Sequence, residues 1–93
     1  MQFEWDEEKA ALNLRKHGIS FEDAALVFND EYRIEYYDAA HSTDEDRYNT
    51  IGKVGEILFV VYTERRAFTR IISARIATPA ERRMYYDRKV FHY

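Results

Sequence analysis

The sequence contains no cysteine, one proline and only three glycines. The absence of cysteine excludes disulfides, thiolate zinc sites and thiol catalysis, and it suits a reducing compartment, so we expect a cytoplasmic protein. The three glycines are scattered, which excludes a glycine-rich phosphate loop. The longest apolar stretch, Ile57 to Tyr62, is far shorter than the roughly 20 residues of a membrane span. We therefore expect no membrane association, and no export signal is visible.

Apolar residues still make up 46% of the 93 residues, and aromatic residues make up 16%. That is enough for a hydrophobic core, and the length predicts one domain spanning residues 1–93. Charge is unevenly distributed: residues 1–46 carry 4 Lys and Arg against 13 Asp and Glu, whereas residues 47–93 carry 10 against 4. The net charge is −3, but the C-terminal half is basic, which predicts an anionic partner.

Local capping signals predict three helices. They span residues 7–17, residues 21–28 and residues 79 to about 90. The most specific signal is Thr78-Pro79-Ala80-Glu81, which combines an N-cap residue, a proline at the first helical position and a glutamate that can complete a capping box. Asp6 and Ser20 are the expected caps of the first two helices.

Runs of β-forming residues predict four strands between the second and third helices. They cover residues 32–37, 47–53, 56–63 and 68–76. The third of these is apolar on both faces, so we expect it to be central, with the N-terminal helices covering one face of the sheet. The predicted fold is α+β: two N-terminal helices, a four-stranded mainly antiparallel sheet and one C-terminal helix.

Basic residues are the candidates for phosphate chemistry. RNA can be cut without a metal if a base takes the 2′-OH proton, a cation stabilises the phosphorane and an acid protonates the leaving oxygen. His17 suits acid or base work, but it equally suits a cation at a helix C-terminus. Arg70 and Arg75 lie five positions apart, so a regular strand sends them to opposite faces unless a bulge intervenes or Arg75 has left the sheet.

Other polar residues favour simpler interpretations. Arg82 is expected on the solvated face of the last helix. His41 lies near three aspartates, but an acidic loop is usually just solvated, and no zinc or EF-hand spacing appears. We therefore predict no metal and no cofactor.

Several strings are more specific than composition. They are Phe3-Glu4-Trp5-Asp6, Lys9 with Asn13, Lys16-His17-Gly18-Ile19-Ser20-Phe21-Glu22-Asp23-Ala24, and Arg70-Ile71-Ile72-Ser73-Ala74-Arg75 with Glu81 and Tyr85 downstream. Taken together they resemble the BrnT family of bacterial toxins. The resemblance implies a RelE-like ribonuclease fold, cutting of RNA that stops translation, and a cognate antitoxin that neutralises the toxin and represses their shared operon. Contact with DNA would then be only indirect, through the antitoxin.

Four candidate catalytic residues lie in the motifs that carry the resemblance: Lys16, His17, Arg70 and Arg75. Their roles are inferred from chemistry, as are the candidate RNA-binding residues Arg47, Lys53 and Arg82. Two hypotheses remain open: a metal-independent endoribonuclease toxin, and a non-enzymatic partner-binding module or inactive toxin homologue. The second stays open because some members of RelE-like folds inhibit gyrase without cutting RNA, so fold alone does not establish activity.

Overall fold

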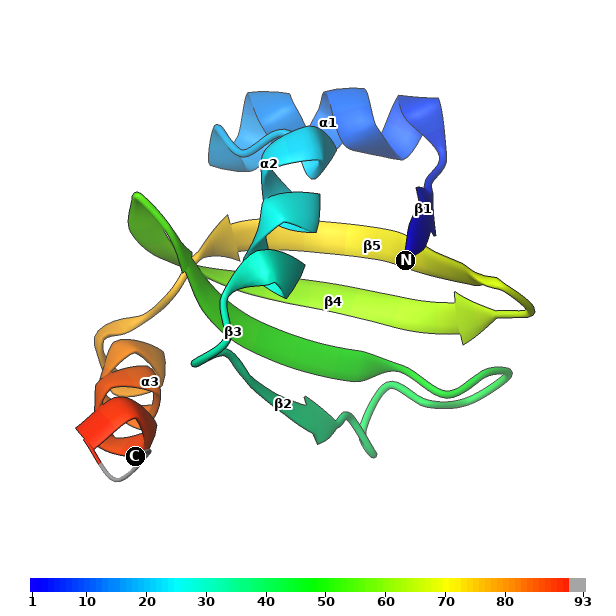
Figure 1. Ribbon diagram of the computed structural model, residues 1–93. Coiled ribbons are helices and arrows are strands. Elements are labelled where there is room, and N and C mark those ends of the chain that lie inside the picture. The colour runs from blue at the N-terminus through cyan, green and yellow to red at the C-terminus, as the bar shows by residue number, and fades with distance from the viewer. Residues whose placement is uncertain (91–93) are drawn as a thin grey trace.

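The protein folds as a five-stranded sheet with helices packed against it, in a computed structural model that describes residues 1–90 (Figure 1). The strands are β1 (Gln2–Glu4), β2 (Ile34–Tyr37), β3 (Tyr48–Val54), β4 (Glu56–Arg65) and β5 (Phe68–Ile76). The helices are α1 (Glu7–His17), α2 (Phe21–Leu26), the 3-10 helix η1 (Val27–Asn29) and α3 (Pro79–Val90). The α+β class predicted from the sequence is confirmed.

The sheet has the order β1-β5-β4-β3-β2, which places β4 at its centre, as its apolar sequence predicted. The pairings of β2 with β3, β3 with β4 and β4 with β5 are antiparallel. The prediction of four strands was wrong in one respect, because β1 is a fifth strand that pairs in parallel with β5. Three residues are too few to show an alternating pattern, and β1 is a strand only because β5 supplies its hydrogen-bond partners.

The helices begin where their caps predicted. The side chains of Asp6, Ser20 and Thr78 each accept a hydrogen bond from the backbone N–H three residues further on. Gly18 ends α1 with a left-handed φ of 73°, and its N–H bonds to the carbonyl of Leu14. Because each bond joins residues of one helical turn, these boundaries follow from the local sequence.

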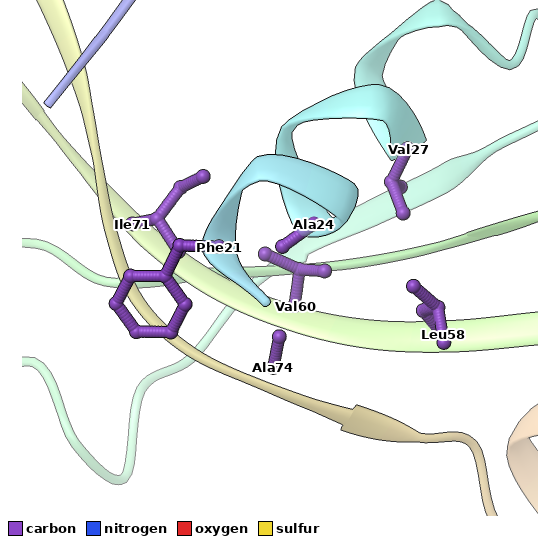
Figure 2. Close-up of a cluster of buried hydrophobic side chains, with 7 residues drawn as sticks. All are labelled: Phe21, Ala24, Val27, Leu58, Val60, Ile71 and Ala74. Atoms are coloured by element: carbon purple, nitrogen blue, oxygen red, sulfur yellow. The ribbon is translucent and has the colours of Figure 1, made fainter. Parts of the chain in front are cut away.

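One face of the sheet, which we call the helical face, is covered by α1 and α2 (Figure 1). Figure 2 shows its core, which consists of Phe21, Ala24 and Val27 from α2 and η1 against Leu58, Val60, Ile71 and Ala74 from β4 and β5. Gly52 on β3 lies close to η1, because a Cβ there would lie 2.7 Å from Val27 Cγ1. A larger residue at this position would force η1 away from the sheet.

Among residues 1–90, the opposite face, which we call the open face, is covered by a helix only at one end. There Ala77 and Tyr85 pack with Ile34, Ile51, Ile57 and Phe59 of the sheet. The Tyr85 hydroxyl donates a 2.6 Å hydrogen bond to Asp30, which also accepts the backbone N–H of Lys53 at 2.8 Å. Burial and the Asp30 carboxylate raise the pKa of Tyr85, so its phenol stays a donor that fastens α3 to the sheet.

Candidate functional site

A β-bulge brings two predicted site residues to the same face. The pairing of β4 with β5 shifts between Val61 and Tyr62, which leaves Ile72 of β5 as an extra residue. The extra residue reverses the alternation of β5, so Arg70 and Arg75 both point to the open face. This is the arrangement that an uninterrupted strand would have excluded.

The uncovered part of the open face contains a cavity of about 380 Å³, which we call the open-face hollow. It is lined by Asp38, His41, Arg47, Asn49, Phe59, Val61, Ile72, Ser73 and Arg75. Its volume lies in the range of about 300–1,000 Å³ that is typical of small-molecule sites. Two arginines and a histidine in one hollow give it the chemistry of a phosphate site.

Arg75 is held rigidly at one side of the hollow. Its guanidinium donates to both carboxylate oxygens of Glu81, at 2.8 and 2.9 Å, and lies 4.1 Å from the centre of the Phe59 ring. Glu81 also accepts the backbone N–H of Thr78, which completes the predicted capping box. The start of α3 therefore positions Arg75. Because this side chain is already ordered, it loses little conformational entropy when an anion binds.

The pair also predicts a pH dependence of stability. The hydrogen bonds from Arg75 hold the pKa of the Glu81 carboxyl below its usual value of 4.5. A depressed pKa in the folded state stabilises the protein above pH 4.5, and this contribution is lost as pH falls through the folded pKa. We expect Glu81→Gln to be less stable than the wild type at pH 7, and the gap in urea midpoint to narrow by pH 3. A gap that stays constant from pH 7 to pH 3 would contradict the pairing.

The other side of the hollow is formed by the loop between β2 and β3. Nδ1 of His41 lies 3.0 and 3.1 Å from the two carboxylate oxygens of Asp38. Burial acts to raise the pKa of Asp38, but hydrogen bonds from the ring and backbone of His41 outweigh it, and the pKa is lowered. The ionised carboxylate thus orients the exposed His41 ring with its second nitrogen available for proton transfer. Within residues 1–90, no carboxylate forms an ion pair with Arg47.

A smaller hollow of about 230 Å³ lies at the outer edge of β5, under α1. It is lined by Lys9, Leu12, Asn13, Lys16 and His17 of α1 and by Ile72 and Ser73 of β5. Because the bulge residues Ile72 and Ser73 line both hollows, the residues predicted on α1 adjoin those on the sheet at this point. Of the predicted residues, Lys16 and His17 line the smaller hollow and Arg47 and Arg75 line the open-face hollow.

The remaining three predicted residues lie elsewhere. Arg70 pairs with Glu4 of β1 at 3.1 Å. Lys53 lies near the C-terminal end of β3, and Arg82 is exposed on α3. None of the three is among the residues that line the two hollows. The bulge places Arg70 on the open face with Arg75. Arg70, however, lies opposite Glu4 of β1, five positions before Arg75 on β5.

Sequence reasoning overlooked three residues of the open-face hollow: Asp38, His41 and Asn49. The first two were interpreted as part of a solvated acidic loop. Their spacing, an aspartate three residues before a histidine, was a signal for an oriented imidazole. Asn49 was also detectable, because asparagine is depleted from strands and this one lies inside a predicted strand.

A further hollow, of about 370 Å³, lies beside β2. It is lined by Phe28, Asp30, Glu31, Arg33, Ile34 and Glu35. Its one cation, Arg33, forms an ion pair with Glu35, and the other two charged residues are acidic. This hollow would repel phosphate, so its similar volume does not make it the candidate site.

Within residues 1–90, His, Asp and Glu side chains form no group of three that could hold a metal ion. No helix in the same part of the chain is long and apolar enough to cross a membrane.

Residues 5–81, which include every residue lining the two hollows, match the family described as "Ribonuclease toxin, BrnT, of type II toxin-antitoxin system". The chain belongs to the BrnT family. The crystal structure of the Brucella abortus ribonuclease toxin BrnT is similar, with a TM-score of 0.67 and 26% sequence identity over 84% of this chain and 97% of that chain. No curated protein matches the chain in sequence. The resemblance to BrnT toxins seen in the motifs is therefore confirmed.

Proposed function

We propose that the chain is a metal-independent endoribonuclease that cuts RNA at the open-face hollow. The observation that carries this proposal is the hollow itself, where Arg47 and Arg75 face one cavity with a histidine that a carboxylate orients. The chain also belongs to a family of ribonuclease toxins, which makes RNA the natural anionic ligand for these cations.

The residues have the following proposed roles. Arg75, fixed by Glu81, and Arg47 hold the scissile phosphate and stabilise the negative charge that develops on it. His41 on one side and His17 or Lys16 on the other transfer protons. The base removes the proton of the 2′-OH, the 2′ oxygen bonds to phosphorus, and the bond to the 5′ oxygen breaks as the acid protonates it. The products are a 2′,3′-cyclic phosphate and a 5′-hydroxyl end.

The same proposal includes a cellular role. Cutting RNA in the cytoplasm would inhibit translation, and a cognate antitoxin protein would neutralise the toxin. We propose that the antitoxin covers the open-face hollow with carboxylates, because acidic groups match its arginines and exclude RNA. Any link to DNA would run through the antitoxin.

One observation favours the alternative, a non-enzymatic module that binds an acidic protein segment. Arg75 is already paired with a carboxylate, that of Glu81, so the hollow accepts carboxylates as well as phosphates. A docking surface would need no proton transfer, and His41 would then be dispensable.

The proposal is tested by inducing the chain in bacteria and by incubating the purified protein with labelled RNA in EDTA. We expect growth arrest, decay of bulk RNA, suppression of both by the co-expressed antitoxin, and fragments that end in cyclic phosphate. We expect EDTA to leave the cleavage rate unchanged, and His41→Ala to lower it. Growth arrest with intact RNA would support the binding module and contradict the nuclease.

A further inference from the structure

Asn49 is the buried polar residue of the open-face hollow. It lies on β3 between Tyr36 of β2 and Val61 of β4, lines the hollow, and is only 6% exposed. Its carbonyl oxygen Oδ1 is buried and accepts no hydrogen bond from the described part of the chain. A buried acceptor without a partner costs about 1–3 kcal/mol, so a residue that leaves one at a binding site calls for a functional explanation.

Two groups beside Asn49 favour one orientation of its amide. Burial raises the pKa of Tyr36, and hydrogen bonding from the Asn49 amide acts against this rise. The same amide adds to the hydrogen bonds from His41 that lower the pKa of Asp38. Turning the amide over would place Oδ1 against the Asp38 carboxylate, and two acceptors would then meet. The oxygen is therefore the end of the amide that is left for a ligand, and a group that enters the hollow can supply the missing donor.

The hollow thus offers two kinds of recognition side by side. Arg47 and Arg75 supply donors and positive charge for a phosphate, whereas Asn49 supplies an acceptor. A phosphodiester has only acceptors and cannot satisfy Asn49. The hydroxyl on the ribose carbon next to the 3′ phosphate is a donor at the right place in RNA, and DNA lacks it.

We propose that Asn49 is a specificity-determining residue whose Oδ1 accepts a hydrogen bond from the ribose 2′-hydroxyl next to the bound phosphate. The contact belongs to the bound ground state and breaks when the base takes the same proton. Asn49 then distinguishes RNA from DNA. This inference rests on the proposed function, since it places RNA in the same hollow. It adds a sugar-reading contact that the arginines cannot make, because a phosphate is the same in both nucleic acids.

The test uses small ligands that cannot be cut. The affinity of the purified protein is measured by calorimetry for uridine 3′-monophosphate, its 2′-deoxy and 2′-O-methyl forms, and the adenosine equivalents. One neutral hydrogen bond corresponds to a preference for the ribose form of about 3- to 10-fold. We expect Asn49→Ala to reduce this ratio to about one for both bases, while affinity for the deoxy forms stays within about twofold of wild type.

Two results would overturn the inference. The first is a wild-type protein that binds ribose, deoxyribose and 2′-O-methyl forms equally, and this measurement needs no variant to fold. The second is a loss of affinity in Asn49→Ala that differs between uridine and adenosine ligands but not between ribose and deoxyribose forms. That result would assign Oδ1 to a donor on the base. The binding measurement requires no cleavage. If the wild-type protein prefers the ribose ligands but does not cut RNA, the proposed nuclease activity is wrong and the inference about Asn49 stands.

Discussion

Replacing Arg75 by alanine is expected to lower the rate of RNA cleavage by about 100- to 1,000-fold, the usual effect of removing one preorganised donor from a transition-state site. The physical reason is the geometry of this side chain. Glu81 and the Phe59 ring hold the guanidinium at the hollow before any ligand arrives. The measurement is the initial rate on labelled RNA, together with growth after induction.

Arg70→Ala is the matched control. Arg70 lies on the same strand and the same face, is similarly half-buried and also pairs with a glutamate, but it does not line the hollow. Arg75→Ala leaves the Glu81 carboxylate unpaired at 15% exposure, whereas Arg70→Ala leaves Glu4 unpaired at 32% exposure, so cleavage is compared at a temperature at which both variants are folded. We expect Arg70→Ala to retain activity within about threefold of wild type. Equal losses in the two variants would place the phosphate site elsewhere.

Replacing Asn13 by alanine is expected to lower the free energy of unfolding by about 2–4 kcal/mol, because two buried backbone groups lose their partners. The Asn13 side chain accepts the N–H of Ala74 at 3.1 Å and donates to the carbonyl of the same residue at 2.8 Å. It also donates to the carbonyl of Ile19 at 3.0 Å. One amide therefore joins α1, the turn after it and β5.

Urea denaturation of the purified protein measures this effect, with Leu14→Ala as the control on the same helix. Leu14 is about half exposed, so its truncation should change stability by no more than about 0.5 kcal/mol. The slope of the unfolding transition should stay the same in both variants. A cost for Asn13→Ala as small as that for Leu14→Ala would show that water replaces the amide.

The parts of the fold that follow from neighbouring residues could be predicted from the sequence. The bounds of α1 and α3 were predicted from their caps, and β5 was predicted from Phe68 to Ile76. β1 and the bulge at Ile72 could not be predicted, because each depends on a strand pairing that only the folded sheet defines. Missing the bulge had a larger effect on the candidate site than missing β1, because the bulge determines the face of the sheet on which Arg75 lies.

The candidate site divides in the same way. Arg75, His17 and Lys16 were identified from motifs, but His41 and Asn49 come to the hollow through contacts that the sequence does not show. The hydroxyl of Ser42 donates to the Asp38 carbonyl at 2.6 Å and accepts the Arg47 N–H at 2.9 Å, which folds the loop back over the sheet. Without that turn, the loop would look like any solvated acidic segment.

Charge along the sequence was an incomplete guide to charge in space. Arg65 and Arg70 of the basic half pair with Glu45 and Glu4 of the acidic half. Folding therefore neutralises part of the basic character that predicted an anionic partner. At the open-face hollow, Arg47 and the outward side of Arg75 remain for a ligand.

The bond between Asn13 and Ala74 also bears on how the protein behaves at high concentration. β1 stops opposite Arg70, so the outer edge of β5 from Ile71 to Ile76 has no neighbouring strand in the described part of the chain. Such an edge invites pairing with a strand from another molecule, the first step of many aggregates. The Asn13 amide occupies both the N–H and the carbonyl in the middle of this edge. One side chain thus keeps the edge of the sheet from acting as a template for other chains.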